Sequence, residues 1–406
     1  MRKLEVYLHT QHVGQLIQDN RGLLFFKYDV DYLVSGRIPL SHSLPLQKER
    51  FTFKQCQGFF SGILPEAHQR TMIARRLGIS PHNDFAMLAK IGGECAGAVT
   101  FLPEGSSPEK QQALYHALSD DELAHILKTL PHQPLMAGQE GVRLSLAGVQ
   151  DKIAVHILKN TVSLPLNGAP STHILKPALP HFPGVVFNEA FCLKLAKIVG
   201  LPAASAEVHT IEDIDYLCVE RYDRIITQNN IERIHQEDFC QALGITSNMK
   251  YQIEGGPSLK RCFHLLREIS TVPALDLQCL LDAVVFNYFI GNHDAHGKNF
   301  SIVYYSSHNR RLAPFYDLLC TRFYPELSCD MAMKIGGEYS LDKISIKHFE
   351  SLAEDIGFST PMVKKRIFEM VQTIQEALHK VDLNHPTSHR IAEIIQNRSR
   401  VYLATA

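Results

Sequence analysis

The sequence lacks the simple signs of a membrane-bound, secreted or nucleic-acid-binding protein. Its 41 Lys and Arg residues balance 42 Asp and Glu residues, so no overall charge favours a polyanionic or membrane partner. No run reaches the roughly 18 uncharged apolar residues of a membrane span. Residues 1–10 alternate like a strand instead of forming the apolar run of a signal peptide. These absences predict a cytoplasmic protein that does not contact a membrane.

Close cysteine pairs are also missing. The nine cysteines are scattered, odd in number and never in CxxC spacing. Zinc sites and redox motifs use such pairs, so neither is expected, and a reducing compartment fits best. With 406 residues and 45% hydrophobic composition, the chain can bury a large core and is expected to divide into two or three domains.

Four segments differ in their patterns. Residues 1–105 mix short strands with one clear helix, and residues 106–140 are expected to form a helical bridge, with paired helical stretches between Pro103 and Pro134. Residues 141–224 are rich in strand signals, and residues 225–406 are mainly helical. The pattern predicts an α+β fold of the bilobal protein-kinase type, with a β-rich N-lobe, a mainly helical C-lobe, an additional small N-terminal α/β module and a helical bridge. A ligand site is expected between the lobes.

Local signals set the expected element boundaries. Pro65 is expected at the first position of the N-terminal helix and Gly78 at its C-terminal stop, and Ser119 with Glu122 forms a capping box. Lys159-Asn160 and Asn167-Gly168 are turn signals, and Asn188 is expected to cap the helix that follows it. Later helices are expected near residues 275–290, 362–379 and 389–401, interrupted by strands at 299–304 and 312–316.

The strongest chemical signal is Gly291-Asn-His-Asp294-Ala-His296-Gly-Lys298-Asn299. It contains D-x-x-x-x-N, the spacing with which protein kinases place an Asp beside the acceptor hydroxyl and an Asn on magnesium. Asp317 then stands where a second metal-binding Asp is expected. Two other interpretations stay open: an exposed polar loop, or a metal-dependent phosphohydrolase with His293, Asp294, His296 and Asp317 as ligands.

An upstream loop and a lysine fit the same chemistry. Residues 145–152 form a small-residue loop before a strand hairpin and could approach phosphates, although a single Gly matches neither the P-loop nor G-x-G-x-x-G. Lys176 stands at the end of the third strand, where kinases keep the lysine that neutralises ATP phosphates. Taken alone, the loop reads as a surface turn and Lys176 as an exposed strand end.

Two further segments have weaker signals. Glu189 could pair with Lys176, or it could merely complement a helix dipole. Glu220 and Tyr222 lie in Val219-Glu-Arg-Tyr-Asp-Arg224, which could form a hinge that offers backbone groups to adenine. The other interpretation of this segment is a solvated strand end with local ion pairs.

Taken together, these segments resemble the HipA family of toxin–antitoxin kinases over nearly the whole chain. Matching pieces also occur at residues 13–16, 59–66, 74–80, 93–97, 172–176, 188–189, 236–241 and 255–257. The resemblance implies Asp294 as the catalytic Asp, Asn299 and Asp317 as Mg²⁺ ligands and Lys176 as the ATP-phosphate lysine. His296 is expected to shape the loop, with Lys298 beside it.

The resemblance further assigns the ATP-binding loop and its regulation. The expected ATP-contacting residues are Ser145, Leu146, Ala147, Gly148, Gln150, Lys152, Glu220 and Tyr222. Ser145 is the implied autophosphorylation site, and a phosphate of about two negative charges there would repel ATP.

Partners are implied only by the family. They are a small helix-turn-helix antitoxin resembling HipB, operator DNA through the antitoxin complex, and an aminoacyl-tRNA synthetase, in particular glutamyl-tRNA synthetase, whose phosphorylation stalls translation and growth and leads to persistence. A DNA-bound corepressor with a decayed kinase site stays open as an alternative, although the intact set Lys176, Asp294, Asn299 and Asp317 argues against decay.

Overall fold

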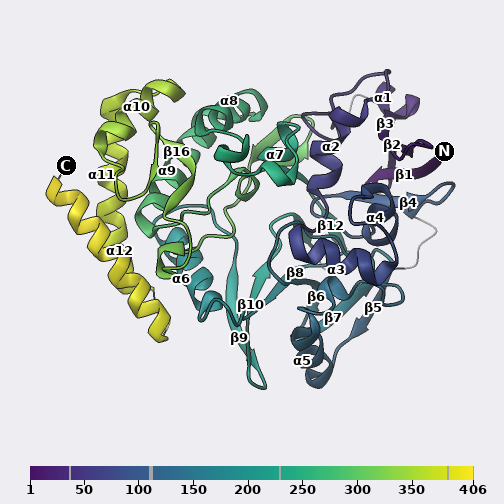
Figure 1. The fold of residues 1–406 in the computed structure, drawn as a ribbon, viewed down its shortest axis with the longest axis horizontal. Helices are drawn as coiled ribbons and strands as arrows, with labels where there is room; N and C mark the ends of the chain where they lie inside the picture. The colour runs from purple at the N-terminus through teal and green to yellow at the C-terminus, as the bar shows by residue number, and fades with distance from the viewer. Residues whose placement is uncertain (36–37, 109–112, 228–229, 382–383, 406) are drawn as a thin grey trace. The chain divides into compact units, whose positions relative to one another are not determined.

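The computed structural model describes residues 1–35, 38–108, 113–227, 230–381 and 384–405 (Figure 1). The chain forms two compact units. Unit 1 comprises Met1–Pro177, His209–Ser247 and Ile302–Arg310, and unit 2 comprises Ala178–Val208, Asn248–Ser301 and Arg311–Ala406. The chain therefore passes between the units several times. The division into four segments expected from the sequence stays a prediction.

The N-terminal part of unit 1 is an antiparallel four-stranded sheet with helices. The strand order is β3-β2-β1-β4, with β1 at Arg2–Leu8, β2 at Gln11–Gln18, β3 at Leu24–Tyr28 and β4 at Val99–Pro103. Between β3 and β4 lie α1 (Val30–Val34), α2 (Phe53–Gly62), α3 (Ala67–Leu77) and α4 (Asp84–Ile91). Gly78 ends α3 in the left-handed conformation, as expected.

A six-stranded sheet in the order β5-β7-β6-β8-β10-β9 forms most of the second part of unit 1, and the first half of β9 belongs to unit 2. Its strands are β5 (Leu114–Ala117), β6 (Ile153–Leu158), β7 (Thr161–Leu166), β8 (His173–Pro177), β9 (Ala206–Ile211) and β10 (Ile214–Glu220). Lys159 and Asn160 both have positive φ, as a two-residue hairpin turn of type I′ requires, so that turn prediction is confirmed. The capping box of α5 (Asp120–Thr129) is also present.

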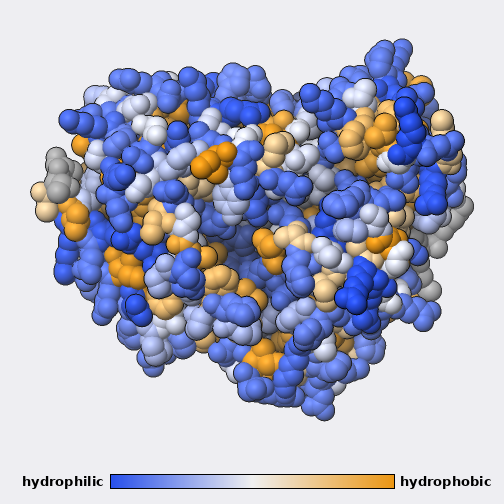
Figure 2. Space-filling view, in the orientation of Figure 1, coloured by the Kyte–Doolittle hydropathy of each residue, from blue (hydrophilic) through white to orange (hydrophobic). Residues whose placement is uncertain are grey.

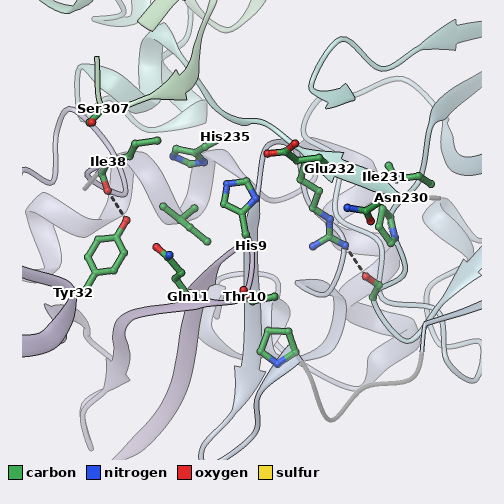
Figure 3. Close-up of a pocket in the computed structure, with 15 residues that line it drawn as sticks. His9, Thr10, Gln11, Tyr32, Ile38, Asn230, Ile231, Glu232, His235 and Ser307 are labelled. Carbon is green, nitrogen blue, oxygen red and sulfur yellow. Dashed lines mark hydrogen bonds between the residues drawn. The ribbon is translucent and has the colours of Figure 1, made fainter. Parts of the chain in front are cut away.

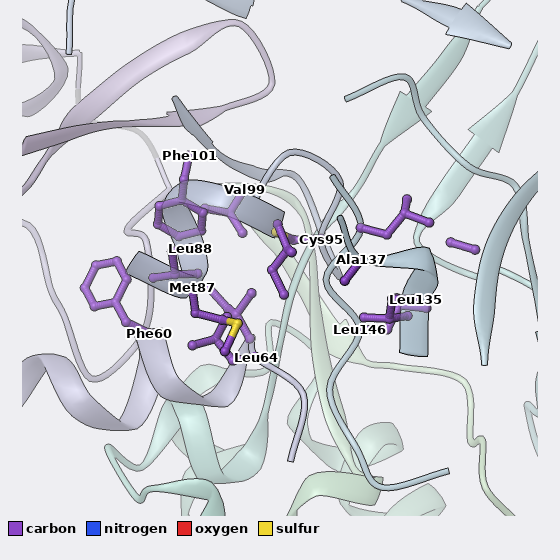
Figure 4. Packing of buried hydrophobic residues seen from close by; sticks show 14 of the residues in the cluster. Phe60, Leu64, Met87, Leu88, Cys95, Val99, Phe101, Leu135, Ala137 and Leu146 are labelled. Carbon is purple, nitrogen blue, oxygen red and sulfur yellow. The ribbon is translucent and has the colours of Figure 1, made fainter. Parts of the chain in front are cut away.

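One hydrophobic core joins the two parts of unit 1. It runs from Leu4 and Phe26 through Phe60 and Phe101 to Leu175 without interruption. In Figure 4, Leu146 lies beside Leu135 and Ala137, and these three residues belong to the same core cluster as the side chains of the N-terminal helices. Because an apolar interior close-packs, the first hundred residues and the six-stranded sheet stabilise one another.

Unit 2 is mainly helical. Its helices are α6 (Val185–Ile198), α8 (Leu259–Ile269), α9 (Pro273–Ile290), α10 (Ile346–Ile356), α11 (Thr360–Ala377) and α12 (Pro386–Thr405), with a small sheet of β16 (Asp330–Ile335) and β17 (Glu338–Ser340). Helix α9 contacts α8, α11 and α12. It is long and apolar enough to cross a membrane by length and composition, but 72% of it is buried, as in the core helix of a globular protein.

Shorter elements complete the chain. They are β11 (Arg224–Ile226), β12 (Ile231–Arg233), β13 (His235–Asp238), α7 (Phe239–Ala242), β14 (Ser301–Ser306) and β15 (Asn309–Leu312). On the face shown in Figure 2, hydrophobic side chains form small groups among hydrophilic ones.

Several boundary predictions are wrong. Helix α3 begins at Ala67, so Pro65 precedes it and instead forms a β-bridge with Gly148. The first of the paired helical stretches is partly replaced by strand β5. Helix α6 begins at Val185, which puts Asn188 inside it. The expected strand at residues 312–316 ends at Leu312, because the chain pairs there only through an isolated bridge of Phe315 with Ala203.

Candidate active site

Asp294 is the exposed residue of an otherwise buried loop. Residues 291–300 are all buried except Asp294. The backbone oxygen of Asp294 accepts from the His296 amide at 2.8 Å and from Asn299 Nδ2 at 3.3 Å, and the Asn299 amide donates to His296 O at 2.9 Å. These bonds close a short turn that ends in the 3-10 turn Gly297–Asn299. The D-x-x-x-x-N spacing therefore holds one carboxylate at the surface of a fixed loop.

Other parts of unit 2 brace this loop. The His293 amide donates to Thr321 Oγ1 at 2.7 Å, while that hydroxyl donates to Gly291 O at 3.1 Å. The Ala332 amide donates to His293 O at 2.7 Å, and Tyr316 donates its hydroxyl to Lys298 O at 2.6 Å. Because these bonds reach the backbone, they fix the loop whatever its side chains contact.

Asp317 is partly exposed and adopts a left-handed backbone conformation, with φ of 51°. A non-glycine residue in this conformation costs about 1–3 kcal/mol, so contacts with the surrounding residues must stabilise the backbone of Asp317. Residues in such conformations cluster at functional sites. Asn188 contributes to this stabilisation. Its Nδ2 donates to Cys320 O at 3.0 Å and its Oδ1 accepts from the Cys320 amide at 2.8 Å. Asn188 therefore pins the turn after Asp317 instead of capping a helix.

The two histidines of the loop are buried and neutral. Burial, helped by the positive charges of Lys250 and Lys298, lowers the pKa of His296 to about 3. Burial with Arg398 and Arg322 lowers the pKa of His293 to about 4. The exposed-loop interpretation is thus wrong for both residues.

A transition-metal site fits this environment poorly. The arginines beside His293 would repel a cation. Across the described parts of the chain, no group of three or more His, Cys, Asp and Glu side chains is placed to hold a metal ion. Asn299 and Asp317 instead offer amide and carboxylate oxygens, the hard ligands that Mg²⁺ prefers alongside substrate phosphates.

A residue that the sequence did not single out contacts Asp294. The Tyr251 hydroxyl donates to Asp294 Oδ1 at 2.6 Å, and its ring packs edge-on against His296 with centroids 5.2 Å apart. The one available signal was the nearby Gly255-Gly-Pro257, which reads from sequence as an ordinary turn.

In unit 1, the loop at residues 145–152 (the phosphate loop from here on) is partly built into the core. Ser145 is fully buried and Leu146 is a core residue, so neither side chain faces solvent. Ala147, Gly148 and Gln150 are half-buried. Gly148 has φ of 105°, and a Cβ there would lie 2.7 Å from Lys152 Nζ. The lysine ammonium therefore lies directly against the loop backbone.

The first hundred residues hold this loop at four points. Ser145 donates its hydroxyl to Ile63 O at 3.0 Å and its amide to Glu94 O at 2.9 Å. The Glu66 amide donates to Gly148 O at 3.2 Å, and Gln69 Nε2 donates to Asp151 Oδ1 at 3.0 Å.

The remaining predicted residues are spread over both units. Lys176 is buried on β8, opposite Leu217 of β10, so it is not the exposed strand end of the alternative interpretation. Glu220 is exposed at the end of β10, and the Tyr222 hydroxyl donates to Gln236. In unit 2, Glu189 is buried on α6 and Lys298 is buried beside Asn299. Unit 2 thus brings Asp294, His296, Lys298 and Asn299 together on one loop, and Asp317 lies close enough to act on the pKa of His296. Their convergence with Lys176 and the phosphate loop stays a prediction.

The segment after Glu220 contributes to a charge cluster, which we call the arginine cluster: the buried residues Glu94, Arg221, Asp223 and Arg224 with the partly buried Arg233. Glu94 Oε1 accepts from Arg224 Nη2 at 2.7 Å and Arg221 Nη1 at 3.2 Å, while Arg233 lies 2.5 Å from Oε2. Burial alone would raise the pKa of Glu94, but the three guanidinium groups outweigh it and lower the pKa to about 2. Burial would also raise the pKa of Asp223, but Arg221 and Arg224 outweigh it and lower that pKa. The solvated strand end is therefore wrong for Arg221 and Asp223, while Glu220 is exposed as that interpretation expected.

A pocket of about 650 Å³ in unit 1 lies away from the predicted ATP-binding residues. In Figure 3, His9, Glu232 and His235 line it. Burial lowers the pKa of His235 to about 4, and burial together with nearby arginines lowers the pKa of His9. None of the residues expected to bind ATP lines this pocket.

The fold and the loops of unit 2 define the class as an α+β protein with a protein-kinase-like body and an additional N-terminal module. Two family models match: the HipA N-terminal domain at residues 4–102 and the HipA-like C-terminal domain at residues 144–378. The chain belongs to the HipA family.

Known proteins of this family are similar to the chain over nearly its whole length. The protein Y4mE of Sinorhizobium fredii is 44% identical over 94% of this chain and 92% of its own length. The serine/threonine-protein kinase toxin HipA of Shewanella oneidensis is 29% identical over 94% of this chain and 90% of its own length. A chain of the solved complex of Shewanella oneidensis MR-1 HipA, HipB and operator DNA superposes with a TM-score of 0.87 at 27% identity, covering 99% of this chain and 97% of that one.

Proposed function

We propose that the protein is an ATP- and Mg²⁺-dependent serine/threonine protein kinase. The observation that carries the proposal is the loop of unit 2 in which Asp294 alone is exposed. A carboxylate so placed can orient a Ser or Thr hydroxyl for in-line attack and accept its proton. Asn299 and Asp317 would hold magnesium, which when bound neutralises the triphosphate. Lys176 and the phosphate loop would hold the phosphates.

The proposed biological role is that of the toxin of a type II toxin–antitoxin module in the cytoplasm. Support comes from the name of the Shewanella oneidensis relative and from the solved complex of HipA with HipB and operator DNA. The proposed partners are a HipB-like antitoxin and, through it, operator DNA. An aminoacyl-tRNA synthetase, with glutamyl-tRNA synthetase as the first candidate, is the proposed substrate, and growth inhibition leading to persistence is the expected consequence.

Substitution of Asp294 tests the kinase proposal. Asp294→Asn keeps the size of the side chain but removes the charge and the proton acceptor, so incorporation of labelled phosphate from ATP should fall at least about a hundredfold. Asp355→Asn is the matched control, because Asp355 is an exposed carboxylate of unit 2 in a loose ion pair with Lys260. Full self-labelling by Asp294→Asn would refute the assignment.

Metal-dependent nucleotide binding separates the kinase from a decayed corepressor. A kinase should show a higher unfolding temperature with ATP and Mg²⁺ together than with either alone, because ligand binding stabilises the folded state. A decayed scaffold should show no such difference. Dephosphorylation activity that needs a bound transition metal and no ATP would favour the phosphohydrolase instead.

A further inference from the structure

The segment around Tyr251 is built to hold that residue in one place. Two 3-10 turns, Ser247–Met249 and Gln252–Glu254, flank it. The amides of Glu254 and Gly256 both donate to Tyr251 O, at 3.0 and 2.9 Å. A Cβ on Gly256 would lie 2.4 Å from Met249 O and 2.6 Å from Tyr251 O, so only glycine permits this close return of the chain.

A second anchor ties the segment to strand β16. Gln252 Oε1 accepts from the Lys334 amide at 2.8 Å. The backbone on both sides of Tyr251 is therefore fixed within unit 2. The Gly255-Gly-Pro257 motif not only turns the chain but also holds Tyr251 in place.

The Tyr251 side chain is fixed as well. Its ring packs edge-on, at 83°, against the buried ring of His296, and Lys250 Nζ lies 5.6 Å from the Tyr251 ring centroid. At 2.6 Å, the bond from its hydroxyl to Asp294 Oδ1 has the length of a charge-assisted O–H···O⁻ hydrogen bond. The Tyr251 phenol, which contacts His296 and Lys250, thus donates a hydrogen bond to the exposed carboxylate of Asp294.

Asp294 has a reason to need this partner. An exposed side chain samples several rotamers, and a catalytic carboxylate that moves by about 1 Å can lose a hundredfold in rate. A carboxylate has about four acceptor sites on its two oxygens, so a phenol on Oδ1 leaves it able to accept a substrate hydroxyl.

We infer that Tyr251 is a positioning residue for phosphoryl transfer, with His296 as its platform. The phenol holds the Asp294 carboxylate in the orientation that meets the acceptor hydroxyl. This inference rests on the proposed kinase function and adds residues 250–257 to the active site.

Tyr251→Phe tests the inference, because it keeps the ring on His296 and removes only the hydroxyl. With MgATP and the protein itself as acceptor, the maximal rate of phosphate incorporation should fall roughly ten- to a hundredfold. The KM for ATP should stay within about twofold, since Tyr251 is not expected to touch the nucleotide. Tyr305→Phe is the matched control, because Tyr305 is an exposed tyrosine on β14 of unit 1.

The outcomes separate this inference from the kinase assignment. An unchanged maximal rate in Tyr251→Phe, with Asp294→Asn inactive, would refute the positioning role and leave the kinase intact. A faster Tyr251→Phe enzyme would also refute it, since the phenol would then block the acceptor. A rise in KM for ATP at an unchanged maximal rate would overturn it in favour of nucleotide binding. Full activity of Asp294→Asn would refute the kinase proposal itself.

Discussion

Glu94→Gln should destabilise unit 1 strongly. In the arginine cluster, two carboxylates face three guanidinium groups, and Glu94 also accepts from the amide and hydroxyl of Ser171 at 2.9 and 2.8 Å. Glutamine would leave one carboxylate against three cations, of which Arg221 and Arg224 are buried. Removing one partner of a buried ion pair costs about 3–5 kcal/mol, because the remaining charge is neither solvated nor compensated.

Thermal unfolding measures this effect. For a unit of this size, the loss corresponds to a fall in unfolding temperature of roughly 6–20 °C. Glu104→Gln is the matched control: its ion pair with Lys3 is exposed, and such pairs contribute about 0–1 kcal/mol. A Glu94→Gln protein that unfolds within about 1 °C of the control would refute the reasoning.

The same variant carries a pH signature. The pKa of Glu94 is about 2 in the folded protein, against an ordinary value of 4.5. Because the pKa is lowered on folding, the carboxylate stabilises the folded state at pH values above 4.5. This stabilisation is lost as the pH falls toward about 2. The difference in unfolding temperature between wild type and Glu94→Gln should therefore shrink below pH 4.5. A difference that stays constant there would contradict the charge argument.

Two further substitutions test the site. Ser145→Asp puts a carboxylate at a fully buried position beside the carbonyl of Ile63, so the phosphate loop should be displaced from the first hundred residues. ATP should then no longer raise the unfolding temperature. ATP stabilisation equal to wild type would contradict this. Asn188→Ala removes both bonds to Cys320, so half-maximal self-labelling should need about ten- to a hundredfold more Mg²⁺. An unchanged Mg²⁺ titration, with exposed Asn309→Ala as control, would show that Asn188 does not act on Asp317.

Features set by local chemistry could be predicted from the sequence. The turn at Lys159-Asn160, the capping box at Ser119 and the stop at Gly78 each depend on a few neighbouring residues, and the structure has all three. Helix α11 was predicted because its apolar residues follow the helical period, and α9 was predicted because it is a long apolar segment. The D-x-x-x-x-N spacing likewise located the exposed carboxylate of Asp294.

Features that depend on distant partners could not be predicted. Arg221 and Asp223 look like solvent-exposed charges until the fold places Glu94 against Arg221, Arg224 and Arg233. Asn188 resembles a helix cap because its partner, Cys320, lies far along the chain. Tyr251 had no motif of its own, since its role arises only where the turn at Gly256 brings it to Asp294.

The four hydrogen bonds that hold the phosphate loop have a consequence for how the molecule can be divided. A fragment starting near residue 141 would keep Asp294, Asn299, Asp317 and Lys176. It would lose Ile63, Glu66, Gln69 and Glu94, and with them all four hydrogen bonds. It would also expose to solvent the apolar side chains of the sheet that pack against the first hundred residues. We therefore expect the isolated fragment 141–406 to keep the reactive groups but to lose the hydrogen bonds that hold the phosphate loop, so that catalytic activity should depend on both parts of the chain.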